Sequence, residues 1–205
     1  MEERGVGMGI INNKKIVFRQ KQISDFLFLQ ACWGHKKQYL KHSLNKHVLG
    51  LKNDFVIFNS EHFLEYFNRC SFFCFDTIYA GGSILFVSSD DNYKRLTLFF
   101  TVRSFQRFYI DKWSGGLVTN NLLEGKIPDV FIVSNLKYDT YLLKEASNRL
   151  TPVLCVEDSD HPVHKSFYSI FANDDKKDSI YLFYSLLTDS IIKSLLASYS
   201  SNLYR

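Results

Sequence analysis

Short apolar runs alternate along the chain with segments in which apolar residues recur every three or four positions. The runs at 55–58, 84–87, 130–133 and 153–156 have the length of β-strands and are apolar at every position. Strands of this kind are typical of a parallel sheet that is covered by helices on both faces. The pattern therefore predicts an α/β protein, a three-layer α/β/α sandwich built on a mostly parallel sheet.

Helix-start signals follow these runs, so the predicted helices alternate with the strands, as in βαβ units. The expected helices begin at Ser60, at Asp90 or Asp91, at about residue 138, and after Asn173-Asp174-Asp175, the last one running to about Tyr199. We expect a single α/β domain at residues 26–205, preceded by an N-terminal extension at residues 1–25.

Composition excludes several classes of protein. With 46% hydrophobic and 22% charged residues, the chain is neither disordered nor fibrous. The longest fully apolar runs, such as 72–75, are far shorter than the ~20 residues of a membrane helix, and no signal peptide is expected. Four cysteines without disulfide spacing predict buried thiols in a reducing compartment: Cys32, Cys70, Cys74 and Cys155.

The positive charge is concentrated in one part of the sequence. The formal net charge is only +4, yet residues 26–53 contain five lysines and three histidines and no acid. A second acid-free window spans residues 92–110. Segregated positive charge is typical of proteins that bind a polyanion such as nucleic acid. The alternative is that both windows are solvated faces, balanced by acids that lie elsewhere in space.

Enzymatic motifs are weak. The glycine-rich segment 5–9 follows no strand, and no phosphate-binding loop of the Walker type is present. A cluster after the fourth run offers either metal ligands or a solvated loop: Asp158, Asp160, His161 and His164. Cys70 and Cys74 have the spacing of half a zinc site, although core packing explains them better. We expect no catalytic residue, no metal and no cofactor.

Several strings in fixed order resemble one known family. They are Trp33-Gly34-His35-Lys36-Lys37-Gln38-Tyr39, Gly50-Leu51-Lys52-Asn53, Gly81–Val87, Lys112-Trp113-Ser114-Gly115-Gly116-Leu117-Val118-Thr119-Asn120, Pro128-Asp129, Lys144-Glu145-Ala146, Pro152-Val153 and Asn173-Asp174-Asp175. Together they resemble the ribosomal protein S2 family, over about residues 26–192. The resemblance implies a flavodoxin-like sandwich and a structural constituent of the small ribosomal subunit.

By the same resemblance, the partners would be small-subunit ribosomal RNA and neighbouring ribosomal proteins at the head–body junction, with no membrane and no small-molecule substrate. Bacterial members carry a long helical hairpin between the Thr-Asn and Pro-Asp strings. Here only seven residues separate Asn120 from Pro128, so we expect this coiled coil to be absent. Such divergence suits a mitochondrial member, and the many residues with AT-rich codons suit an organelle-encoded protein of the mitochondrial matrix.

The RNA-binding residues expected from the basic windows and the resemblance are His35, Lys36, Lys37, Tyr39, Lys41, Lys46, Lys52, Arg103, Arg107, Lys112 and Trp113. Lysine and arginine would contact phosphates, while Tyr39 or Trp113 would stack on a base. Packing under a loop is the alternative for both aromatic residues. Arg103 and Arg107, four residues apart, are expected on one helix face.

Two other functions remain open at the level of sequence. One is a nucleotide- or metal-dependent α/β enzyme that uses the loop at residues 158–164. The other is an RNA-binding module that acts outside the ribosome.

Overall fold

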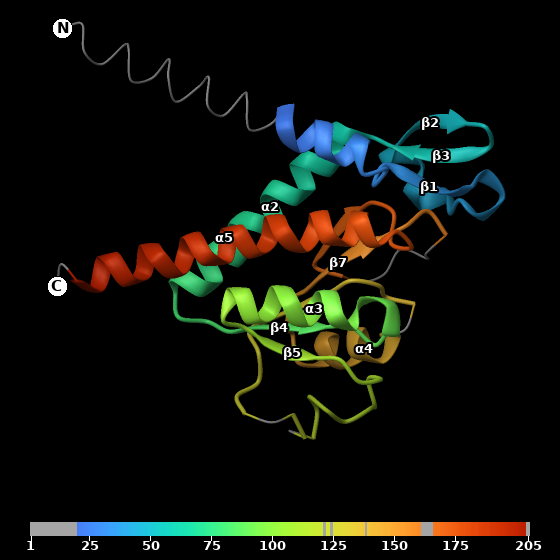
Figure 1. Cartoon of the computed structure of the whole chain (residues 1–205). Coiled ribbons are helices and arrows are strands. Elements are labelled where there is room, and N and C mark those ends of the chain that lie inside the picture. The colour runs from blue at the N-terminus through green and yellow to red at the C-terminus, as the bar shows by residue number, and fades with distance from the viewer. Residues whose placement is uncertain (1–19, 121, 124, 138, 161–165, 204–205) are drawn as a thin grey trace, which may run out of the picture.

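A computed structural model describes residues 20–203, except 121, 124, 138 and 161–165. Its centre is a parallel sheet of five strands in the order β5-β4-β6-β7-β8, with helices on both faces (Figure 1). The strands are β4 (Ile84–Val87), β5 (Arg107–Tyr109), β6 (Val130–Val133), β7 (Val153–Glu157) and β8 (Tyr168–Phe171). The predicted three-layer α/β/α sandwich with a parallel sheet is thus confirmed.

Alternate residues of the central strands enter two separate cores, because successive side chains of a strand point to opposite faces. In β6, Val130 and Ile132 pack in one core, while Phe131 and Val133 pack in the other. β4 and β7 divide their residues in the same way. This two-sided burial is the reason that β4, β6 and the first four residues of β7 are all apolar.

Three helices cover one face of the sheet and one helix covers the other. The first face carries α2 (Ser60–Tyr79), α3 (Asp91–Ser104) and α5 (Lys177–Leu203), with α5 packed against both of the others. The second face carries α4 (Thr140–Asn148) together with the loop that contains Trp113. Cys70, Cys74 and Cys155 are fully buried and Cys32 is nearly so, as the sequence predicts.

Among the described residues, α5 is the one helix that is long and apolar enough to cross a membrane. Polar residues such as Asp189 and Lys193 interrupt its sequence, so it contains no long uninterrupted apolar run. Core helices also pass this test. Ile180, Tyr184 and Leu187 of α5 are fully buried in the first core, so this helix has the packing of a core helix.

A smaller antiparallel sheet extends from one end of the molecule (Figure 1). It consists of β1 (Trp33–Lys36), β2 (Val48–Lys52) and β3 (Phe55–Phe58), in the order β1-β3-β2. The expectation that the run at 55–58 belongs to the parallel sheet is therefore wrong. Only a tight turn at Asn53 and Asp54, both with positive φ, separates β2 from β3, and so short a connection permits only antiparallel pairing.

The helix starts are close to those expected. The Asn59 side chain, rather than that of Ser60, accepts the N–H of Glu61 and caps α2, and Asp90 caps α3. Asn173 accepts the N–H groups of Asp175 and Lys176 just before α5. The first described helix, residues 20–28, spans the expected domain boundary, and the segment 5–9 lies outside the described residues.

His47 connects the two sheets. It ends the 3₁₀-helix η2 (His42–His47), is 3% exposed, and stacks on Phe171 of β8 at a centroid distance of 3.7 Å. Burial, with smaller contributions from the charges of Lys46 and His62, lowers the pKa of His47 to about 4. The ring is therefore neutral in the folded protein at neutral pH.

This lowered pKa predicts acid sensitivity. Between pH 6.5 and 4 the unfolded chain takes up a proton at His47 that the folded chain does not, so stability is lost as the pH falls. For His47→Phe, which keeps the stacked ring, urea unfolding at pH 7 and pH 4 should show a smaller loss than the native chain, by about 3 kcal/mol. Parallel pH profiles for the two proteins would contradict this assignment.

Candidate RNA-binding surface

Five lysines gather on the antiparallel sheet and the 3₁₀-helices within it. Their side chains are exposed, and no ion pair joins any of them to an acid within the described residues. We call these residues the lysine surface: Lys36, Lys37, Lys41, Lys46 and Lys52. Lys52 also lies over the Trp33 ring at 5.6 Å. The result is a group of exposed cations, without direct ion pairs to the described acids, on one projecting part of the fold.

Backbone hydrogen bonds hold the lysine surface against the parallel sheet. Ser159, just after β7, accepts the His35 N–H through its hydroxyl at 2.8 Å and the Lys41 N–H through its carbonyl at 3.1 Å. A Cβ on Gly34 would lie 2.8 Å from the Ser159 hydroxyl oxygen, so glycine permits this close approach. Leu44, 1% exposed, anchors η2 in the first core. These contacts fix the position of the backbone that carries the lysines.

Tyr39 ends the short 3₁₀-helix η1 (Lys37–Tyr39) and is 52% exposed. Its ring lies within the same segment as the lysines, with a face available to a ligand. An exposed aromatic ring among cations is the arrangement by which proteins stack on unpaired bases.

The predicted arginine pair is not on one helix face. α3 ends at Ser104, Phe105 takes a left-handed conformation, and Arg107 is the first residue of β5. Arg103 pairs with Asp189 of α5 at 3.5 Å, while Arg107 donates a hydrogen bond to the Lys126 carbonyl. Neither Gly nor Pro marks the end of α3, so the sequence pattern gives no sign that the helix stops before Arg107.

Lys112 and Trp113 lie in the loop after β5. Lys112 is exposed, whereas Trp113 is 2% exposed and packs edge-on against Tyr109 and Phe131. The Trp113 ring therefore belongs to the second core and has no face free for a base. Of its two sequence interpretations, packing under a loop fits the structure.

The Gly-Gly string is held in place by α4. The Glu145 carboxylate, 7% exposed, accepts the N–H of Gly116 and the N–H of Val118, the latter at 2.9 Å. Arg149 donates to the Thr119 carbonyl at 2.7 Å. Gly116 has a φ of +96°, which favours glycine, as expected for a tight turn. The two strings that the sequence shows separately, around Gly116 and Glu145, form one unit.

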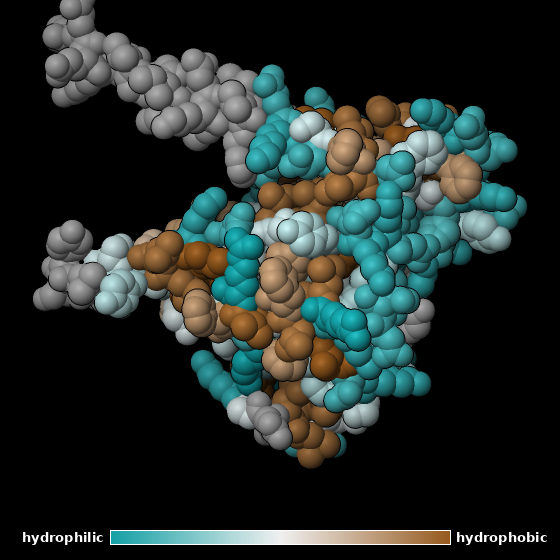
Figure 2. Space-filling view, in the orientation of Figure 1, coloured by the Kyte–Doolittle hydropathy of each residue, from teal (hydrophilic) through white to brown (hydrophobic). Residues whose placement is uncertain are grey.

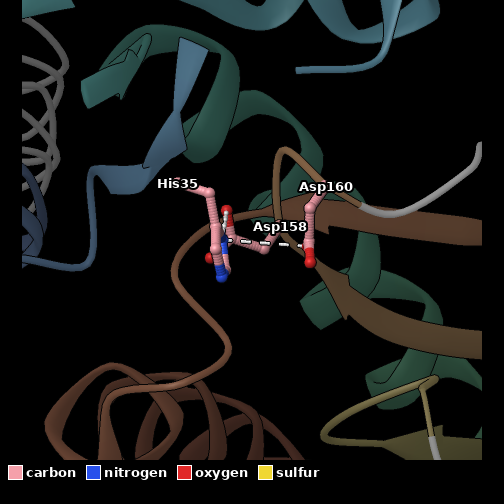
Figure 3. A group of neighbouring side chains, drawn as sticks. All are labelled: His35, Asp158 and Asp160. Atoms are coloured by element: carbon pink, nitrogen blue, oxygen red, sulfur yellow. Dashed lines mark ion pairs between the residues drawn. The ribbon is translucent and has the colours of Figure 1, made fainter. Parts of the chain in front are cut away.

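A polar cluster lies beside the lysine surface, where β1 meets the carboxyl ends of the parallel strands (Figure 3). His35 Nδ1 lies 3.2 Å from Asp158 and 3.8 Å from Asp160, and Nε2 lies 3.0 Å from Asp175. Lys137, after β6, lies 3.2 Å from Asp160. These ion pairs join the antiparallel sheet to three neighbouring strand ends.

Neighbouring groups of the cluster shift one another's pKa values. The hydrogen bond with Asp158 raises the pKa of His35 to about 9, so the ring is a cation at neutral pH. Burial, followed by the charge of Asp158, raises the pKa of Asp174 to about 8. The acids thus compensate the positive charge of His35, which distinguishes it from the five neighbouring lysines.

Sequence reasoning found the acids of this cluster but not their arrangement. Asp158 is fully buried, so its interpretation as part of a solvated loop is wrong. His35 takes the place beside the acids that was expected for His161 or His164, both of which lie outside the described residues. The cluster could have been predicted, because the carboxyl ends of parallel strands meet at one edge of a sheet. Donor atoms of His35, Asp158 and Asp160 lie within 4.8 Å of one another, so these ligand types could hold a metal ion.

The connection between β5 and β6 is the place where bacterial members would carry the helical hairpin. Between Tyr109 and Val130 the described residues form turns and no helix or strand, so the chain passes from β5 to β6 without a coiled coil.

Comparison with known proteins agrees with this architecture. The family model for ribosomal protein S2 matches residues 27–124 and 121–194, two segments that meet where the hairpin is absent. The small ribosomal subunit protein uS2 of Psychrobacter sp. (strain PRwf-1) is 22% identical, covering 82% of each chain. Protein uS2 of Shewanella sediminis is 24% identical over 78% of this chain and 85% of its own. Protein uS2m of Marchantia polymorpha is 22% identical over 89% of this chain and 94% of its own.

The family match spans most of the chain, and it covers both the antiparallel sheet with its lysine surface and the parallel sheet. The chain therefore belongs to the ribosomal protein S2 family and is a structural, non-enzymatic protein of the small ribosomal subunit.

Proposed function

We propose that this protein belongs to a mitochondrial small ribosomal subunit and binds its ribosomal RNA through the lysine surface. The observation that carries the proposal is the group of five exposed lysines without acidic partners in the described structure, on a backbone fixed by Ser159. Lysines in such a group bind phosphates, which position a protein on RNA without reading its sequence. Tyr39 stacks on an unpaired base beside them.

The remaining expected residues have different roles in this proposal. Lys112, exposed in the loop after β5, makes a separate phosphate contact. Arg103 and Arg107 are secondary contacts, because Asp189 and the Lys126 carbonyl already engage their guanidinium groups. His35 holds the lysine surface against the parallel sheet rather than contacting RNA, and Trp113 packs beneath the loop.

Two observations support the mitochondrial origin. The uS2m protein of Marchantia polymorpha matches nearly the whole chain. In addition, 75 of the 205 residues are Phe, Tyr, Ile, Asn or Lys, whose codons are rich in A and T. Within the subunit we place the protein at the head–body junction, in contact with neighbouring ribosomal proteins.

The enzyme alternative has no support in the family, whose members are structural. Of the four residues of its loop, Asp158 and Asp160 form ion pairs with His35, and Asp158 is fully buried, while His161 and His164 lie outside the described residues.

Sedimentation of two lysates, one from the mitochondrial fraction and one from the rest of the cell, tests the proposal directly. We expect the protein to migrate with small-subunit ribosomal RNA at low salt and to leave it as salt rises, since binding through several phosphates weakens steeply with salt. Detection among soluble proteins at low salt would contradict ribosomal binding. Detection only with ribosomes outside the mitochondrial fraction would contradict the mitochondrial assignment.

A further inference from the structure

One face of the antiparallel sheet places an aromatic ring between two lysines. Lys36 of β1 and Lys52 of β2 are both paired with Phe55 of β3, one on each side. Residues that lie directly opposite one another on neighbouring strands point to the same face of a sheet, so these three side chains form a row. All three are exposed on the projecting sheet (Figure 1).

A second row lies next to the first. It consists of Trp33, Ile57 and Gly50, and we call the two rows together the outer face. The Trp33 and Phe55 rings are in edge-to-face contact, with centroids 6.2 Å apart, and the Lys52 ammonium lies 5.6 Å from the centroid of the Trp33 ring. Attraction between the cation and the ring therefore keeps Lys52 over the outer face, beside Phe55.

The opposite face of this sheet is covered by the chain itself. Val56 and Phe58 point to that face and are buried, and a Cβ on Gly34 would lie 3.2 Å from the Phe58 ring. On the outer face, Trp33 is half-buried against the first core, whereas Phe55 is 36% exposed. Phe55 is therefore the ring of this face that a ligand can reach.

Positive charge dominates around the outer face. β1, β2 and β3 contain no acid, and the only acid in residues 26–60 is Asp54, which is exposed in the turn beside Phe55. Figure 2 shows mainly hydrophilic atoms over this end of the molecule, with hydrophobic atoms among them. A ring between cations complements a polyanion that also carries flat apolar groups, and a nucleic acid has both properties.

The ring distinguishes between two forms of RNA. In a double helix each base is covered by its neighbours, so the outer face would meet phosphates and groove edges, and Phe55 would contribute nothing. An unpaired segment exposes the faces of its bases, and RNA-binding domains stack such bases on aromatic side chains of a sheet. The position of Phe55 therefore favours unpaired RNA.

Other occupants fit this face less well. A protein partner would find one exposed ring between two cations, which is too little apolar surface for the core of an interface. A second copy of this chain would bring the same lysines together across a symmetric interface.

We propose that the outer face binds an unpaired segment of the ribosomal RNA, with one base stacked on Phe55 and the phosphates on either side of that base bound by Lys36 and Lys52. This inference rests on the proposed function, because it assumes that the lysine surface binds ribosomal RNA. It adds the form of RNA that is bound and assigns Phe55 a role that phosphate binding alone does not require.

Binding of one RNA in two forms tests the inference. The full chain is titrated with a labelled RNA of mixed sequence and about 12 nucleotides, either single-stranded or annealed to its complement, and fluorescence anisotropy gives Kd. We expect tighter binding of the single strand. Phe55→Val keeps an apolar residue that suits a strand but removes the ring. It should raise Kd for the single strand on the order of tenfold and leave Kd for the duplex within about twofold.

Matched variants separate stacking from charge and from folding. Phe55→Trp keeps a ring and should bind the single strand as the native chain does, while Phe108→Val removes a ring of similar exposure from β5 and should have no effect. Phe55→Val should leave the slope of log Kd against log salt unchanged. Lys36→Gln with Lys52→Gln should make that slope shallower by about 0.7 for each lysine. Circular dichroism confirms that each variant is folded.

The possible results distinguish this inference from the proposed function. A native chain that prefers the duplex, or a Phe55→Val variant that binds the single strand as well as the native chain, would overturn stacking on Phe55 and leave phosphate binding by the lysine surface intact. A native chain that binds neither RNA at low salt would overturn the proposed function and this inference with it.

Ultraviolet irradiation of native small subunits gives a test that needs no variant. We expect mass spectrometry to find Phe55 joined to a ribosomal RNA nucleotide that lies outside helices. A crosslink of this residue to a paired nucleotide or to another protein would contradict the inference, and so would the absence of any RNA crosslink within residues 48–58.

Discussion

Replacing Lys36, Lys37 and Lys41 together by glutamate is expected to abolish incorporation into the small subunit. Each phosphate that the variant no longer binds makes the slope of log affinity against log salt shallower by about 0.7–0.9, and the introduced acids repel the remaining phosphates. The fold should persist, because the three side chains are exposed and have no acidic partner in the described structure. Sedimentation measures incorporation, and circular dichroism of the isolated variant measures the fold.

The matched control carries glutamate at Lys126, Lys144 and Lys177. These residues lie on other parts of the surface, and their replacement changes the net charge by the same amount. We expect this control to enter subunits nearly as the native chain does. If the two triple variants behave alike, only total charge matters, and the lysine surface is not the RNA-binding face.

Glu145→Ala is expected to destabilise the fold by about 2–4 kcal/mol, because it removes the acceptor of two backbone N–H groups. Urea unfolding measures the loss, and hydrogen exchange should show faster exchange at Gly116 and Val118. Glu145→Gln keeps one acceptor oxygen and should cost less. Lys144→Ala, at the neighbouring surface position, should change stability by no more than about 0.5 kcal/mol. Equal stabilities of the Glu145→Ala and Lys144→Ala variants would show that the carboxylate does not hold the loop.

Sequence patterns predicted those parts of the fold in which the hydrophobic pattern of a segment agrees with its burial in the folded chain. β4, β6 and the first four residues of β7 are apolar because both faces of these strands are buried, and that pattern has few alternative explanations. β1 and β2 were not predicted, because β1 is short and mixes glycine, histidine and lysine while β2 is largely exposed, so neither strand shows a hydrophobic alternation. β5, with three partly exposed residues, is too short to show a period.

The same distinction applies to the candidate site. The clustering of lysines was predictable, because they are close in sequence. The ion pairs of His35 were not, because they join residues more than 120 positions apart. The role of Trp113 was ambiguous, because the sequence around a tryptophan does not reveal whether its ring faces the core, as here, or the solvent.

The contacts that hold the antiparallel sheet against the rest of the chain have a consequence for biogenesis. β1, β2 and β3 are complete once residue 58 has been synthesised, and their pairing is local. Their anchors are made much later, since Ser159 and Phe171 lie in the last quarter of the chain. A nascent chain on the translating ribosome therefore carries the lysines before it can hold them in place. The newly made protein becomes competent for assembly only after the segment that contains Ser159 and Phe171 has been synthesised.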